Sequence, residues 1–92
     1  MDRNVEPSID QGVYGLLSSA NLPVPNQMVT IYAAGAPGAF ATSDPDGFYQ
    51  IDLPNGDYML CTVGCITIST PSSATVRYDW TDGPGGGTWD KI

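Results

Sequence analysis

An alternation of apolar and polar residues limits this chain to β structure. From Gly12 onward apolar side chains recur at every second position, and no stretch keeps the helical i, i+3, i+4 spacing for three turns. Seven short runs show the alternation: residues 13–17, 29–33, a weaker run at 40–43, 49–53, 58–62, 66–68 and 74–80. One face of each strand must be dry, so the alternating positions of these runs are also the expected core.

Turn-forming residues separate the seven runs. Each interval contains Gly, Pro, Asn or Asp, which adopt turn dihedrals at low cost. The pairs Asp46-Gly47 and Asn55-Gly56 are strong hairpin signals, so the third, fourth and fifth strands are expected to form a meander. A sheet with one apolar face needs a second sheet to cover it, and the regular spacing of turns therefore predicts an all-β sandwich of seven strands.

The length of 92 residues allows one small domain with a single two-layer core. We assign this domain to residues 12–92, with a Gly-rich loop at 82–87, and expect the polar, aperiodic residues 1–11 to form a flexible leader. No run approaches the ~20 apolar residues that span a bilayer, and the N-terminus lacks the features of a signal peptide. The chain is therefore either cytoplasmic or the mature part of an exported protein, where such a leader often follows a cleavage or lipid-anchoring point.

Charge and composition exclude several classes of function. Ten acidic and three basic residues give a net charge of −7 and a pI near 4.1, so the surface is expected to repel nucleic acids and anionic membranes. Histidine is absent from the sequence. Its absence removes the usual general base, the partner of Ser and Cys nucleophiles, and the commonest zinc ligand. We therefore expect no enzymatic activity, no cofactor and no metal centre.

Four motifs follow one another in the first two thirds of the chain. They are Val13-Tyr-Gly15, PVPNQMVTIY at 23–32, ATSDPDGFY at 41–49 and LPNGDYML at 53–60. This succession resembles the carboxypeptidase regulatory-like family, whose relatives include CnaB-type and transthyretin-like (prealbumin-like) sandwiches. The resemblance covers residues 12–62. It implies a seven-stranded, prealbumin-like Greek-key β-sandwich, usually an accessory, spacer or binding module of exported and cell-surface bacterial proteins.

Two activities of these relatives are not expected here. The internal isopeptide crosslink of CnaB-type domains needs a buried lysine, and Lys91, the sole lysine, is the second-last residue of the chain. Transthyretin-like hydroxyisourate hydrolases use histidine, which this chain does not have.

Cys61 and Cys65 are separated by three residues, a connection short enough to let two strands turn back and bring the two β-carbons together. A hairpin disulfide is the preferred interpretation, with buried free thiols as the next. A metal pair would leave a tetrahedral site half empty, and the spacing is not that of a Cys-x-x-Cys redox motif. A disulfide would place the protein outside the reducing cytosol.

Asp44, Asp46 and Asp52 cluster within nine residues, which raises the question of a calcium loop. The glycine comes at position four of this segment and Asn55 at position twelve, whereas an EF-hand needs Gly at six and Glu at twelve. An Asx-stabilised hairpin turn is the preferred interpretation.

The segment 80–89 places two tryptophans on either side of a glycine-rich loop. Trp80 continues the inward series of its strand and is expected in the core. Trp89 either closes the open end of the sandwich or lies exposed as a stacking platform for a sugar or a protein. Tyr32 and Met28 share the outward face of the second strand and are candidates for a binding patch, although scattered surface apolar residues are ordinary.

Two functions remain from these observations. The first is a non-catalytic structural or protein-interaction module of an exported bacterial envelope or extracellular protein. The second is a carbohydrate-binding module that uses Trp89, with Trp80 or Tyr32, to stack on a polysaccharide. The first is preferred, because a sugar site normally adds several polar groups that converge beside the aromatic ring.

Overall fold

The computed structural model describes residues 6–33 and 36–92, and over these residues the chain forms strands and no helix. The prediction of an all-β protein is confirmed. Seven strands correspond to the seven expected runs, and two further strands, β2 and β9, are present. The nine strands of the described residues are β1 (Gly12–Ser19), β2 (Leu22–Pro23), β3 (Met28–Ala33), β4 (Ala36–Thr42), β5 (Phe48–Asp52), β6 (Gly56–Cys61), β7 (Cys65–Thr70), β8 (Thr75–Thr81) and β9 (Thr88–Lys91).

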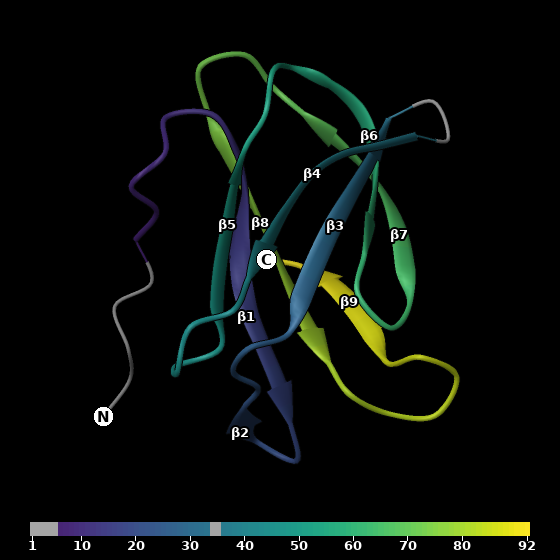
Figure 1. Ribbon diagram of the computed structural model, residues 1–92. Helices are drawn as coiled ribbons and strands as arrows, with labels where there is room; N and C mark the ends of the chain where they lie inside the picture. The colour runs from purple at the N-terminus through teal and green to yellow at the C-terminus, as the bar shows by residue number, and fades with distance from the viewer. Residues whose placement is uncertain (1–5, 34–35) are drawn as a thin grey trace.

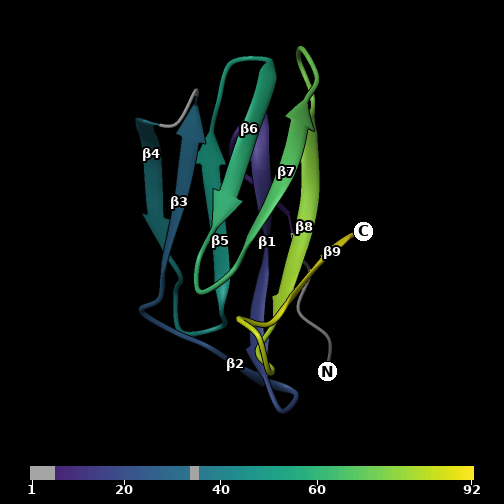
Figure 2. The same ribbon diagram turned by 90° about the vertical axis from the view of Figure 1, so that its right-hand side faces the viewer.

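The strands form two packed sheets, which confirms the predicted sandwich (Figure 1). The five-stranded sheet has the order β2-β1-β8-β9, with β5 also paired to β1. The four-stranded sheet has the order β4-β3-β6-β7, and Figure 2 looks onto it with these strands from left to right. Neighbouring strands pair antiparallel except β1 and β8, which are parallel.

The expected meander of the third to fifth strands is wrong. β4 pairs with β3, β5 pairs with β1, and β6 pairs with β3 and β7. The turns at Asp46-Gly47 and Asn55-Gly56 therefore carry the chain from one sheet to the other. The turn residues determine that the chain reverses, whereas the choice of partner strand depends on which apolar faces must cover each other.

The core lies between the two sheets, and the expected alternation accounts for most of it. The buried apolar side chains are Val13, Leu17, Val29, Ile31, Phe48, Tyr49, Ile51, Leu53, Leu60, Cys61, Ile68, Tyr78 and Trp80. Phe48 and Cys61 are also buried, but they lie on the opposite faces of their strands from the inward Tyr49 and Leu60 and are not part of the core cluster between the sheets.

The segment preceding β1 is tied to the sandwich over its described part. The Ser8 backbone N–H donates to the side chain of Gln50 at 2.8 Å. The Gln11 side chain donates to the Leu53 carbonyl at 2.9 Å and accepts from the Ser73 backbone N–H at 2.8 Å. Residues 1–5 of the expected leader lie outside the described residues. In the part of the chain that is described, no helix is long and apolar enough to cross a membrane.

Candidate functional site

Trp80 belongs to the core, as the alternation predicts. Its side chain is 2 % exposed, and its indole N–H donates to the Gly86 carbonyl at 3.0 Å. The glycine loop passes close over the ring, because a Cβ at Gly87 would lie 2.6 Å from indole atoms of Trp80. The loop at 82–87 therefore covers the end of the core.

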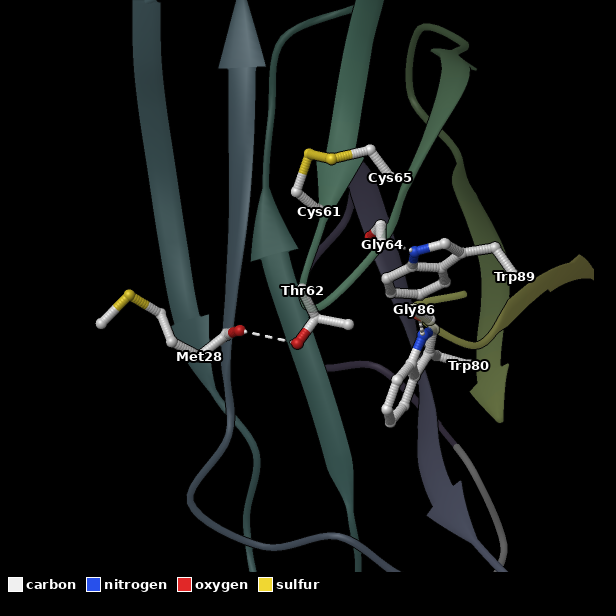
Figure 3. The surroundings of a disulfide bond; sticks show 8 residues. All are labelled: Met28, Cys61, Thr62, Gly64, Cys65, Trp80, Gly86 and Trp89. Carbon is white, nitrogen blue, oxygen red and sulfur yellow. Dashed lines mark hydrogen bonds between the residues drawn. A yellow bond between two sulfur atoms is a disulfide. The ribbon is translucent and has the colours of Figure 1, made fainter. Parts of the chain in front are cut away.

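Trp89 joins the two sheets at the same end of the sandwich (Figure 3). Its half-buried indole donates to the Gly64 carbonyl at 2.9 Å, and its ring packs edge-on against Tyr49 with the centroids 6.1 Å apart. Both indole N–H groups are thus bonded to backbone carbonyls of the sandwich itself. Trp80 is therefore a buried packing residue, and the half-buried Trp89 is held against the sandwich by its hydrogen bond and its ring contact.

The disulfide predicted between Cys61 and Cys65 is present. The two residues are directly opposite in the β6–β7 register, with their Cα atoms 4.1 Å apart, and the loop at 62–64 closes the hairpin. Gly64, which receives the hydrogen bond of Trp89, lies in this loop. The disulfide therefore braces the tip to which β9 is attached.

The strongest candidate for a binding surface is the face of the four-stranded sheet that points away from the other sheet, which we call the outer face. Three of its apolar side chains are unusually exposed: Phe40 at 66 %, Met28 at 56 % and Met59 at 45 %. The strand register arranges the outward side chains of this sheet in rows that run across the strands. One row runs Phe40, Thr30, Cys61, Cys65, and the next runs Tyr32, Met59, Thr67.

A groove of about 580 Å³ crosses the outer face. It runs along β6, with β3 on one side and β7 on the other. Its lining residues are Tyr32, Asp57, Tyr58, Met59, Cys61, Thr62, Cys65 and Thr67. Rings and sulfur atoms dominate this surface, and the polar groups are hydroxyls together with the carboxylate of Asp57.

Charge is nearly absent from this sheet. The sequences of β3, β4, β6 and β7 contain no Lys or Arg and one acidic residue, Asp57, whose carboxylate accepts from the Ser69 hydroxyl at 2.6 Å. The described cations lie on the other sheet. Arg77 on β8 forms a two-point contact with Asp79, at 3.0 and 2.9 Å, and Lys91 is on β9. The protein is therefore strongly acidic overall, whereas its outer face is nearly free of charge.

The acidic segment after β4 forms an Asx turn, as preferred from its sequence. One carboxylate oxygen of Asp44 accepts from the backbone N–H groups of Asp46 at 2.9 Å and Phe48 at 3.0 Å. Across the residues that the structure describes, no group of three His, Cys, Asp or Glu side chains is placed to hold a metal ion.

Sequence reasoning singled out Tyr32 and Met28 on the outer face but missed Phe40, Met59 and Asp57. A signal for them does exist. Met28, Tyr32, Phe40 and Met59 are apolar residues in the polar phase of their strands, so that both faces of the four-stranded sheet carry apolar side chains. This excess on one sheet makes the outer face the candidate binding surface of the described residues.

The fold defines the class of this protein as a small, disulfide-bridged all-β sandwich. No protein-family model matches the chain, and no curated protein matches it. The resemblance to carboxypeptidase regulatory-like domains stays a prediction from sequence motifs.

Proposed function

We propose that this chain is a non-catalytic interaction module of an exported bacterial envelope or extracellular protein, and that it contacts its partner through the outer face. The observation that carries the proposal is the exposure of Phe40, Met28 and Met59 on a face whose strands carry one charged side chain, in a protein with net charge −7. Depletion of charge with enrichment of aromatic residues and Met is the composition of an interface core.

Two further observations support the proposal. The Cys61–Cys65 disulfide suits an oxidising compartment outside the cytosol. The chain has no histidine, the usual general base, and one carboxylate oxygen of Asp44 is engaged in its own turn.

Affinity capture from a bacterial envelope extract tests this proposal. Immobilised protein should retain a partner, and the substitution Phe40→Lys together with Met59→Lys should abolish retention. The control variant carries Leu22→Lys and Ile92→Lys, which alter exposed apolar residues outside the outer face and add the same charge. Equal retention by the two double variants would refute a role for the outer face.

Carbohydrate binding is the second candidate, and one observation favours it. The ring of Tyr32 and the hydroxyl of Thr67 line the groove on either side of Met59, an arrangement that a neutral sugar could use. Trp80 does not support it, because its ring is buried, and Trp89 lies at the end of the sandwich and is not among the residues that line the groove.

A further inference from the structure

We propose that the groove of the outer face binds an extended basic peptide segment of a protein partner, with apolar side chains of the segment on Tyr32, Met59 and the disulfide and a Lys or Arg against Asp57. This inference rests on the proposed function and names the kind of partner. Three properties of the groove carry it: its size, its chemistry and its charge.

The size of the outer face suits an extended segment better than a folded partner. Four strands at ~4.8 Å spacing and six residues at ~3.3 Å rise give a face of roughly 19 by 20 Å. This area is about half of the ~800 Å² that each partner buries in a stable interface between folded proteins. A second copy of this chain would also bring another net charge of −7. An extended peptide needs a path about 20 Å long, which takes six residues.

The chemistry of the groove suits apolar side chains. Met59 and the Cys61–Cys65 disulfide offer soft, polarizable surface, and Tyr32 adds the face of a ring. Methionine is over-represented on surfaces that accept varied peptide side chains, because its flexible thioether adapts to their shapes. A sugar site needs several polar groups that converge on the ligand. Here Asp57 is bonded to Ser69, and the remaining polar side chains are mainly hydroxyls.

Charge decides which peptides the groove accepts. Asp57 provides one carboxylate at the groove, and the four strands around it provide no cation. The acidic residues elsewhere on the chain attract a cationic segment from a distance and repel an anionic one. Apolar residues interleaved with Lys or Arg meet both requirements.

Nuclear magnetic resonance titration of the full ¹⁵N-labelled chain tests the proposal. The probe is a synthetic peptide with the repeat Leu-Leu-Lys-Lys, about eight residues long, which is enough to cross the face in extended form and places both Leu and Lys on each side of the extended chain. One comparison peptide has Glu in place of Lys, and a second has Ser in place of Leu. We expect the Lys-Leu peptide to shift amide signals of β3, β6 and β7 and the two comparison peptides to leave them unchanged.

A matched pair of variants locates the site. Met59→Lys and Leu22→Lys each place one positive charge at an exposed apolar position, the first in the groove and the second on β2. Met59→Lys should weaken the peptide affinity at least about tenfold, the size of effect seen for a central interface residue. Leu22→Lys should change it less than about twofold. Met59→Thr, which is uncharged, provides a second loss-of-contact variant, and thermal melts confirm that each variant is folded.

Three outcomes would overturn the proposal. The first is equal weakening by Met59→Lys and Leu22→Lys, which would show non-specific attraction. The second is equal binding of the Glu-Leu peptide. The third is no shift with any peptide but shifts of the same residues with a neutral β-1,4-linked glucose hexasaccharide, which would make the groove a sugar site. A different result is failure of the peptide to bind while capture from envelope extract still depends on Phe40 and Met59. That result would reject the basic peptide as the ligand and would leave the proposed interaction function supported.

Discussion

Tyr49 shows how one side chain completes an interrupted strand pair. The β1–β8 ladder is interrupted between Tyr14 opposite Arg77 and Leu17 opposite Trp80. Within this interruption the Tyr49 hydroxyl donates to the Tyr78 carbonyl at 2.6 Å. The ring is 1 % exposed. Burial, followed by the nearby charge of Asp79, raises the pKa of the Tyr49 hydroxyl far above its ordinary value. The neutral phenol is therefore the form that the fold requires.

This pKa shift predicts alkaline destabilisation. Below about pH 10 the phenol is protonated in both the folded and the unfolded state, so its contribution to stability is constant. Above about pH 10 the unfolded state loses the proton and the folded state keeps it, so the free energy of unfolding should fall by about 1.4 kcal/mol per pH unit. Denaturant unfolding from about pH 8 to 11 measures this slope.

Tyr49→Phe is the matching substitution. It should lower the free energy of unfolding at pH 7 by about 1–3 kcal/mol, because the buried Tyr78 carbonyl loses its donor. It should also remove the Tyr49 part of the alkaline slope. An unchanged slope in Tyr49→Phe would show that another group causes the loss of stability.

Gly15 lies on β1 at the same interruption of the β1–β8 pairing, and its lack of a side chain leaves room for the Tyr78 carbonyl. A Cβ at this position would lie 1.8 Å from the Tyr78 carbonyl oxygen, which is backbone and cannot turn away. Gly15→Ala should therefore destabilise the protein by about 3 kcal/mol or more, measured by urea unfolding. Gly83→Ala is the control, since nothing lies within 4 Å of a Cβ there. Equal stability of the two variants would contradict this account of Gly15.

At the scale of elements, the β6–β7 hairpin and β9 hold each other in place. The disulfide closes the hairpin, and the tip carbonyl of Gly64 accepts the indole N–H of Trp89. Gly64 also lies against the glycine loop, because a Cβ there would lie 2.9 Å from the Gly86 carbonyl oxygen. The last strand of the chain is thus attached to the opposite sheet through one short loop.

The double substitution Cys61→Ser and Cys65→Ser should loosen this attachment. A loop of five residues removes only modest entropy from the unfolded chain, so the loss should be about 2 kcal/mol in the free energy of unfolding. The emission of Trp89 should shift to the red as its indole gains water. The same double substitution in a Trp89→Phe background provides the control, and a shift of equal size there would assign the change to Trp80.

Particular elements show what the sequence could and could not predict. The core phase of β1, β3 and β8 was predictable, because their inward side chains are apolar without exception over the buried stretch. β9 was missed because Asp90 and Lys91 break its alternation, and its burial depends on Trp89 reaching across to the hairpin tip. The β1–β2 hairpin was missed because its turn uses Ala20 and Asn21 at φ of 51° and 67°, without the glycine that usually marks such a turn.

The candidate site was predictable only in part. Tyr32 and Met28 could be assigned to an outward face from their strand phase alone. Phe40, Met59 and Asp57 join them only through the pairing of β3 with both β4 and β6. The expected meander would have separated these residues, so the outer face as a continuous surface depended on the long-range strand order.

At the scale of the whole molecule, the uneven distribution of charge opposes self-association. Each chain carries a net charge of −7 at pH 7, and the repulsion between two chains acts against contact between their outer faces, which are nearly free of charge. Near the pI of about 4.1 the net charge vanishes while the exposed side chains of Phe40, Met28 and Met59 are unchanged. We therefore expect the protein to be monomeric at pH 7 and to associate reversibly near pH 4, with light scattering during size-exclusion chromatography as the measurement. Phe40→Lys with Met59→Lys should prevent this association. The double variant Leu22→Lys with Ile92→Lys shifts the pI equally and should still associate like the unsubstituted protein. If both double variants associate to the same extent, general insolubility at the pI, and not contact through the outer face, holds the chains together.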